Sequence, residues 1–289
     1  MKNLISTIFS DFITKKSLAR LPPQGEGDAK RKLFLFFLLM AANSSFAIPT
    51  SDPCATGVLA LLNRPSITGS ACVIPKQKIM IEGGYQYFNL PGGAQGYSTP
   101  QAEIRFGLPG ENELLIAAPT FFHETKIPRA GWSAPIVSLK HELGYNTHWL
   151  GAVEGLVTIP SGSEHYGSKA WAGAVNGIAT YTFNPALSIT GTLGVMSQSV
   201  QYIKNGQRFK SINPDVIATW QFDSQWMVFG ELYAQTRTGP GEGLGLLTDA
   251  GFYYLLTPRV SLDAELGQRI TGQWGFISYA GAGIGILFG

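Results

Sequence analysis

From Lys78 onward the chain repeats one pattern: segments that alternate apolar and polar residues, joined by connections of alternating length. Such alternation is typical of β-strands. We expect twelve strands, at 78–88, 99–108, 112–123, 132–145, 149–160, 169–183, 186–199, 209–222, 225–237, 245–256, 259–270 and 274–288. The long connections are 89–98, 124–131, 161–168, 200–208 and 238–244, with a short exception at 271–273. The tight turns are Pro109-Gly110-Glu111, Asn146-Thr147-His148, Asn184-Pro185, Asp223-Ser224 and Thr257-Pro258. Loops at one end and turns at the other indicate an all-β, closed antiparallel up-and-down transmembrane β-barrel.

Each expected strand has one apolar and one polar face. In strand 259–269, Leu262 and Leu266 share one face, whereas Asp263 and Glu265 share the other. Strands 209–223 and 99–108 divide in the same way. A soluble β-sandwich would also alternate, with its apolar face inside. Alternation alone therefore leaves both folds open.

Aromatic residues separate the two folds. All six Trp lie at or within three residues of an expected strand end: Trp132, Trp149, Trp171, Trp220, Trp226 and Trp274. Amphipathic rings prefer the membrane–water interface, so membrane barrels carry aromatic girdles at both rims. Aromatics of a sandwich core fall in mid-strand as readily as at the ends. The aromatic positions favour the membrane barrel.

Charge is scarce and unevenly placed. Only 14% of residues are charged, against roughly 25% in soluble domains. Residues 1–47 hold seven bases and three acids, which leaves 14 bases and 16 acids from Ile48 onward and a net charge of −2 there. Nucleic-acid binding needs a concentrated basic face, so we expect no nucleic-acid partner.

The N-terminal segment is typical of an exported protein. Lys30-Arg31-Lys32 precedes ten uncharged residues, 33–42, and small residues follow at Ser45 and Ala47. We interpret 1–47 as an N-terminal extension and a cleavable signal peptide, directed to the outer membrane of a Gram-negative bacterium. A short buried helix is the alternative, and residues 1–29 are either a true extension or the result of a start codon assigned too far upstream.

A short segment separates the signal from the barrel. Residues 48–76 are rich in Pro, Ser and Thr, and we interpret them as a periplasmic lead-in to the barrel at 77–289. Cys54 and Cys72 are a local pair in an exported chain, which predicts a disulfide. Two free thiols are the alternative.

Several strand and turn sequences resemble a known family. One is the run 255–263, which continues to Thr271-Gly272. The others are the pair of segments Glu103–Leu108 and Asn112-Glu113-Leu114, and the segment 140–144. They are similar to the outer-membrane transporters of the meta-pathway phenol-degradation family, over most of 77–288. The resemblance implies a barrel and, at most, passage of small hydrophobic or aromatic molecules. Such barrels usually end on an aromatic residue that the barrel-assembly machinery, a partner during biogenesis, reads; here Phe288 is penultimate and Gly289 follows.

The polar face of the strands would line the lumen, while outer-membrane lipid surrounds the apolar face. The lumen-lining candidates are Glu103, Arg105, Lys140, Glu142, Glu154, Asp215, Glu231, Arg237, Asp249, Asp263, Glu265 and Arg269. Such charges would either orient a small-molecule solute in a narrow aqueous path or form an ion-pair network that fills the barrel. A twelve-stranded barrel is intermediate in diameter between filled eight-stranded barrels and open porins, which favours an aqueous path over a filled interior.

An enzyme is the competing class. Alternation places His141 on the lipid-facing side, where a lipid hydrolase could use it, but Ser138 points to the opposite face. The other histidines, His123, His148 and His165, lack metal-ligand spacing, and the glycine-rich run 239–245 lacks the Lys-Ser/Thr of a phosphate loop. We expect a non-enzymatic channel or uptake barrel without cofactor or metal. The alternatives are a hydrolase using His141 and a closed structural or adhesive barrel.

Overall fold

The structure, a computed structural model, describes residues 52–289 except 68, 126–128, 200–205 and 273–274. The chain divides into two units, Met1–Ala47 and Ile48–Gly289. The first unit, which holds the expected extension and signal peptide, lies outside the described residues. No helix in the described part of the chain is long and apolar enough to cross a membrane.

The second unit is built almost entirely of strands. Its short helices are η1 (Pro53–Thr56), α3 (Val58–Leu61) and η2 (Pro91–Gly93). Its strands are β1 (Ile79–Asn89), β2 (Gln95–Thr99), β3 (Glu103–Leu108), β4 (Asn112–Ala117), β5 (Phe121–Glu124), β6 (Arg129–Trp132), β7 (Ile136–Tyr145), β8 (Trp149–Thr158), β9 (Ala172–Asn184), β10 (Leu187–Gln198), β11 (Phe209–Gln221), β12 (Trp226–Gln235), β13 (Gly245–Thr257), β14 (Val260–Thr271) and β15 (Ser278–Phe288).

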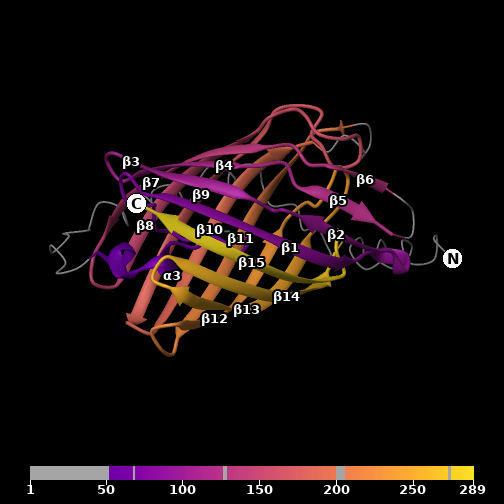
Figure 1. Cartoon of the computed structure of the whole chain (residues 1–289). Coiled ribbons are helices and arrows are strands. Elements are labelled where there is room, and N and C mark those ends of the chain that lie inside the picture. The colour runs from indigo at the N-terminus through magenta and orange to yellow at the C-terminus, as the bar shows by residue number, and fades with distance from the viewer. Residues whose placement is uncertain (1–51, 68, 126–128, 200–205, 273–274) are drawn as a thin grey trace, which may run out of the picture. The chain divides into compact units, whose positions relative to one another are not determined.

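The first and last strands close the sheet into a barrel. β1 pairs antiparallel with β15 along its whole length, from Ile79 opposite Phe288 to Asn89 opposite Ser278. The ring runs β1-β3-β4-β7 and then in sequence order from β8 to β15, which is twelve strands. Figure 1 shows the indigo β1 beside the yellow β15. The predicted closed, up-and-down barrel is confirmed, and closure leaves the ring without an exposed edge.

Three expected strands, 99–108, 112–123 and 132–145, are interrupted by a proline: Pro100, Pro119 or Pro135. The second divides into β4 and β5. The first and third continue as β3 and β7, and only Thr99 and Trp132 of them belong to β2 and β6, which otherwise fall in the expected loops 89–98 and 124–131. Proline lacks the N–H that a ladder requires, which explains why continuous strands were the wrong prediction here.

The three breaks lie side by side in the wall. The Ala118 N–H donates to the Ala102 carbonyl and the Ser133 N–H to the Thr120 carbonyl, both at 2.8 Å. Beyond the breaks, β2, β5 and β6 form a branch of the sheet. The connection 159–171 folds against this branch, because the Ser163 N–H donates to the Trp132 carbonyl at 2.9 Å.

The first long connection is also shorter than predicted. We expected a loop at 89–98, but β2 begins at Gln95 and continues the ladder with β1, with Gln86 opposite Ser98. The Leu90 N–H donates to the Ala94 carbonyl at 2.8 Å and closes the turn. Cross-strand pairing therefore extends into a segment whose Gly and polar residues indicated a loop.

The predicted alternation of faces is confirmed by burial. Leu266 is 69% exposed on the outer surface, whereas Asp263 and Glu265 point inward and are 6% and 5% exposed. Aromatic rings cluster at the end of the tight turns, where the ring centroids of Trp149 and Tyr181 lie 4.8 Å apart. The outer surface is therefore an apolar belt with an aromatic rim, as a wall that faces lipid requires.

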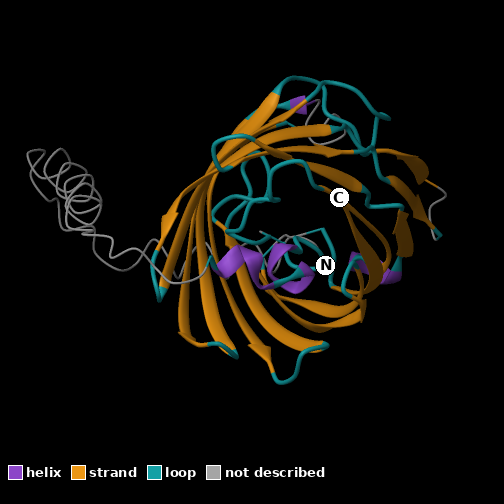
Figure 2. Cartoon of the chain, turned by 60° about the vertical axis from the view of Figure 1, so that its left-hand side comes forward, coloured by secondary structure: helices purple, strands orange, loops and turns teal. Residues whose placement is uncertain are grey.

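The described residues of 52–76 lie inside the ring of strands, and we call this segment the plug. Figure 2 shows its helices across the opening of the barrel. Val58, Leu61 and Ile74 are 1%, 2% and 1% exposed. The sequence predicted a periplasmic lead-in at 48–76. The described apolar residues of this segment, which has no strand periodicity, are buried in the lumen, where they are shielded from water.

Candidate functional site: a plugged lumen

A buried ionic network joins β1, β3 and β4 inside the barrel. Arg105 donates to Glu113 through two parallel bonds, from Nε to Oε1 at 2.9 Å and from Nη2 to Oε2 at 2.8 Å. Its Nη1 donates to Glu82 at 2.9 Å and also to the carbonyl of Leu61 in the plug. Arg105, Glu82 and Glu113 are all 0% exposed. A bidentate guanidinium between two carboxylates offsets much of the cost of burying these charges.

The remaining acceptors of this network bind the backbone of the plug. Glu82 accepts from the Arg64 N–H at 2.8 Å, and Glu113 accepts from the Ile74 N–H at 2.8 Å. Unpaired backbone donors would be costly inside a barrel, so these carboxylates satisfy groups that the plug cannot satisfy by itself.

Two further inward charges hold the middle of the plug. Lys140 Nζ donates to the Ser70 carbonyl at 2.9 Å, and both oxygens of Glu231 lie 3.1 Å from the Ile67 N–H. Lys140 and Glu231 are on strands far apart in the ring, β7 and β12. The plug is therefore anchored from opposite sides of the sheet as well as from β1, β3 and β4.

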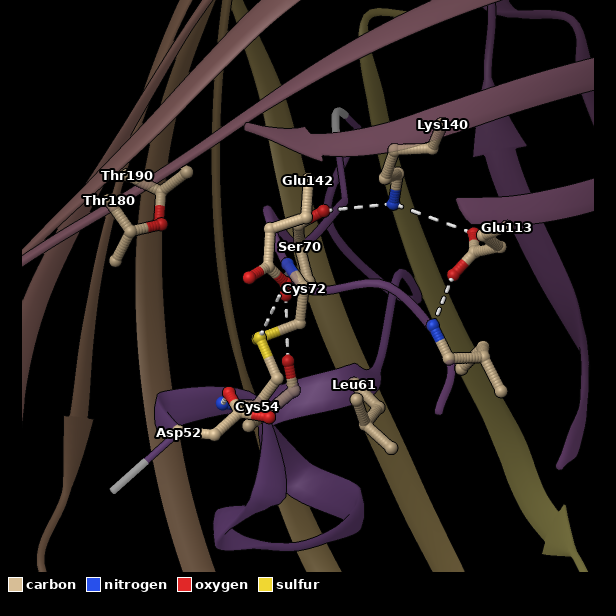
Figure 3. Close-up of a disulfide and its surroundings, with 12 residues drawn as sticks. Asp52, Cys54, Leu61, Ser70, Cys72, Glu113, Lys140, Glu142, Thr180 and Thr190 are labelled. Carbon is tan, nitrogen blue, oxygen red and sulfur yellow. Dashed lines mark hydrogen bonds and ion pairs between the residues drawn. A yellow bond between two sulfur atoms is a disulfide. The ribbon is translucent and has the colours of Figure 1, made fainter. Parts of the chain in front are cut away.

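A disulfide closes the plug on itself. Cys54 and Cys72 are bonded, with Cα atoms 5.4 Å apart and a sequence separation of 18. Figure 3 shows the bond beside Ser70, with the ion pair of Lys140 and Glu113 next to it. Both cysteines belong to the plug, so the bond shortens the segment and restricts its conformations without tying it covalently to a strand.

The opposite side of the plug is apolar. Val58, Leu59 and Leu61 form one cluster with inward residues of β8, β9, β11, β12 and β13. On these five strands the wall residues of the cluster are Leu150, Ala152, Ile178, Ile217, Phe229 and Tyr253, and Met80 of β1 and Leu287 of β15 also belong to it. A water-filled lumen would not favour six such side chains, and burying them against the plug gives both surfaces a partner.

On the side of the barrel formed by β1, β3 and β15, inward glycines leave room for the plug. A Cβ at Gly107 would lie 2.0 Å from the Pro75 carbonyl oxygen, and one at Gly84 would lie 2.4 Å from the guanidinium of Arg64. At Gly285 it would lie 2.8 Å from Leu62. Glycine in these strands allows the close approach of a second backbone, which is one of its known uses in a sheet.

Cavities remain beside the plug, and two of them are large enough to hold a small molecule. The larger, of about 640 Å³, is lined by the turn residues His148 and Pro185 and by the hydroxyls of Thr180 and Thr190. The smaller, of about 300 Å³, lies farther along the barrel, next to Ala117 and Ile136 at the broken strands. Ser66 and Gly69 of the plug line both cavities. The plug therefore narrows the lumen and divides it.

Most of the residues predicted to line the lumen point inward. Those that are at most 8% exposed are Arg105, Lys140, Glu142, Glu154, Asp215, Glu231, Asp249, Asp263 and Glu265. Glu103 and Arg269 are half-buried on the same faces. Arg237 differs: it is exposed and follows the end of β12 at Gln235, so it lies outside the sheet rather than in the lumen.

Sequence reasoning missed several residues that anchor the plug. Glu82 and Glu113 lie in expected strands, but glycines next to Glu82 and an apolar residue at Leu115 on the face of Glu113 obscure the two-residue period. Asn63 and Arg64 lie in the segment interpreted as a lead-in. Glu82 and Glu113 lie on the two strands that pair with the strand of Arg105, and an inward carboxylate on each of them is the signal that could have identified the network.

The geometry gives no support to chemistry at His141. Its ring is exposed on the outer face, and Nδ1 lies 3.1 Å from the side-chain oxygen of Asn112, beside a tight turn. An amide is neither a nucleophile nor an acid that could orient a catalytic histidine. Among the described residues no group of three or more His, Cys, Asp or Glu side chains could hold a metal ion.

Comparisons with known proteins agree with this architecture. The family model described as "Putative MetA-pathway of phenol degradation" matches residues 62–281. The COG4313 outer membrane channel from Pseudomonas putida F1 has a similar fold, with a TM-score of 0.61 at 9% identity over 77% of this chain and 100% of that chain. The NanC porin gives a TM-score of 0.51 at 12% identity, over 73% of this chain and 99% of that chain. A comparison with curated protein sequences gave no match.

Proposed function

Because this chain belongs to the family described as the "Putative MetA-pathway of phenol degradation", we propose that it is a passive outer-membrane channel for the uptake of small molecules, hydrophobic or aromatic ones included. The supporting observation is that cavities of about 640 and 300 Å³ flank the plug. A barrel filled only for stability would pack its interior to the density of other protein cores.

The charges of the lumen support selectivity against anions. Inward carboxylates such as Glu154, Asp249 and Glu265 outnumber the inward bases Arg105 and Lys140. A narrow path between low-dielectric walls concentrates this negative potential. We expect the channel to admit uncharged molecules and cations in preference to anions.

The plug sets the width of the path. The plug lies in the lumen from Cys54 to Ile74, and hydrogen bonds to at least four charged wall residues hold it, among them Glu82 and Glu231. Passage through the native protein is therefore restricted to small solutes, and the single-channel conductance should be low.

Planar-bilayer recording of the purified, folded barrel tests the proposal. Small, discrete conductance steps with a preference for potassium over chloride are expected. A barrel that is demonstrably folded by its heat-dependent migration in gel electrophoresis, yet remains silent at all potentials, would overturn the channel and favour a closed structural or adhesive barrel.

A further inference from the structure

One wall of the smaller cavity carries polar atoms that lack partners. Thr192 and Asn213, on β10 and β11, are 5% and 8% exposed. Within the described part of the chain, Thr192 Oγ1 and Asn213 Oδ1 have no hydrogen-bond partner, and both residues line this cavity. Buried polar atoms in native proteins are nearly always hydrogen-bonded, so two such atoms on neighbouring strands beside one space indicate a hydrogen-bonding occupant.

The opposite wall of the same cavity carries apolar side chains next to Ser138, Glu154 and Asn176. The apolar residues come from β4, β7, β8 and β9: Leu115, Ala117, Ile136, Leu156 and Ala174. Side chains of this kind favour contact with a hydrocarbon or aromatic surface over contact with water. The cavity therefore combines a surface for an apolar body with a small number of convergent polar groups, as ligand-binding pockets do.

The charged groups at this cavity already have partners. Glu154 accepts from Ser138 and from Asn176 Nδ2, the latter at 3.0 Å, and Glu103 accepts from Asn63 Nδ2 at 3.0 Å. Because both carboxylates are already hydrogen-bonded, neither needs a bound cation, but their negative charges repel an anion.

The positive charge of Arg64 is compensated in the same way. Its Nη2 lies 3.3 Å from Asp263 Oδ1 and its Nη1 donates to Gln101 at 2.6 Å. Its Nε faces β15, where a Cβ at Gly283 would lie 2.5 Å away, so the guanidinium is directed at the wall and not at an occupant beside Asn213. Together, the polar groups suit an uncharged molecule.

We propose that the smaller cavity is a binding site for a small uncharged molecule that carries a hydroxyl group on an apolar body. The hydroxyl donates to Asn213 Oδ1 and accepts from Thr192 Oγ1, while the apolar body lies against Leu115 and Leu156. The inference deepens the proposed function, on which it rests, because it makes this cavity the point at which the channel selects its solute.

The test measures binding to the full chain, refolded in detergent, with 4-fluorobenzyl alcohol as the probe. Fluorine NMR of the probe should show saturable binding. The matched anion 4-fluorobenzoate, with the same ring and a carboxylate in place of the alcohol, should bind at least tenfold more weakly. Equal binding of the two probes would overturn the assignment of an uncharged ligand.

Substitutions locate the site. Thr192→Val and Asn213→Leu keep the approximate size of each side chain and should weaken binding of the alcohol about threefold to tenfold each, the effect of one lost hydrogen bond. Thr180→Val is the control, because Thr180 lines the larger cavity and its hydroxyl is paired with Thr190 at 2.7 Å. Loss of binding in the control alone, or unchanged binding in both site variants, would overturn the proposal.

The binding proposal and the channel proposal can be refuted independently. If the barrel binds the alcohol at the predicted residues but is silent in bilayers, the binding site is supported and the channel is refuted. If the barrel conducts but shows no saturable binding of the alcohol, the channel is supported and the binding site is refuted, because water alone would then satisfy Thr192 and Asn213.

Discussion

Arg105 holds the network that anchors the plug, and Arg105→Met is the substitution that tests it. Methionine retains most of the length of the side chain but donates no hydrogen bond. It removes both bonds to Glu113, the bond to Glu82 and the bond to the Leu61 carbonyl. Glu82, 0% exposed, then loses the cation that it binds, and Glu113, also 0% exposed, keeps only Lys140, whose Nζ lies 3.6 Å away.

The expected cost to the plugged state follows from that burial. Removing one partner of a buried ion pair typically costs about 3–5 kcal/mol. With the plug displaced, both carboxylates can be hydrated, so most of this cost falls on the plugged state and little on the open one. Since each 1.4 kcal/mol is a factor of ten, the population with the plug displaced should rise roughly a hundredfold to several-thousandfold.

Hydrogen exchange followed by mass spectrometry measures this change directly. Peptides from 58–74 should exchange much faster in Arg105→Met than in the native protein, while β9 to β14 keep their protection. Single-channel conductance should rise in parallel. Arg208→Met is the control, because Arg208 is exposed and donates to Ser197 at 3.0 Å, a surface contact worth little.

Native rates of exchange over 58–74 in a folded Arg105→Met barrel would refute the reasoning. Such a result would mean that the apolar contacts of Val58 and Leu61 with the β9–β13 wall hold the plug by themselves. The ionic network would then contribute no net stability to the plugged state, as replacement studies of some buried ion pairs have found.

Three further predictions concern the same segment. Replacing both Cys54 and Cys72 by Ser removes a cross-link that closes a loop of sequence separation 18. This change should lower the free energy of unfolding by about 3 kcal/mol, according to the loop-entropy estimate. Denaturant titration with and without reductant measures the loss, and equal unfolding midpoints for the native protein and the variant would contradict the prediction. Gly107→Ala places a Cβ 2.0 Å from the Pro75 carbonyl, so exchange at 74–77 should rise, whereas Gly155→Ala, with open space around the added carbon, should behave as the native protein. Glu231→Gln keeps the size of the acceptor but weakens the bond to the Ile67 N–H, so exchange near 67 should rise several-fold; a protection pattern identical to the native one would show that this contact does not anchor the plug.

The sequence by itself determined the membrane barrel. A strand alternates its faces regardless of its neighbours, so Leu266 against Glu265 could be read as outside and inside from the chain alone. The tight turns and the aromatic residues at the strand ends are equally local signals. Together they predicted the number of strands in the ring and most of the inward charges, because each depends on residues that are adjacent in the chain. Closure followed indirectly, because a sheet that faces lipid cannot leave an open edge.

Only the tertiary structure decided what fills the barrel. The plug has no period that marks it as an interior segment, and its partners Glu82, Glu113 and Glu231 lie 18, 39 and 164 residues from the backbone N–H groups that they bind. The side-by-side breaks at Pro100, Pro119 and Pro135 likewise depend on the register of three strands. Which inward charge faces water, and which binds a backbone, is set by contacts across the lumen, and no pattern along a single strand contains that information.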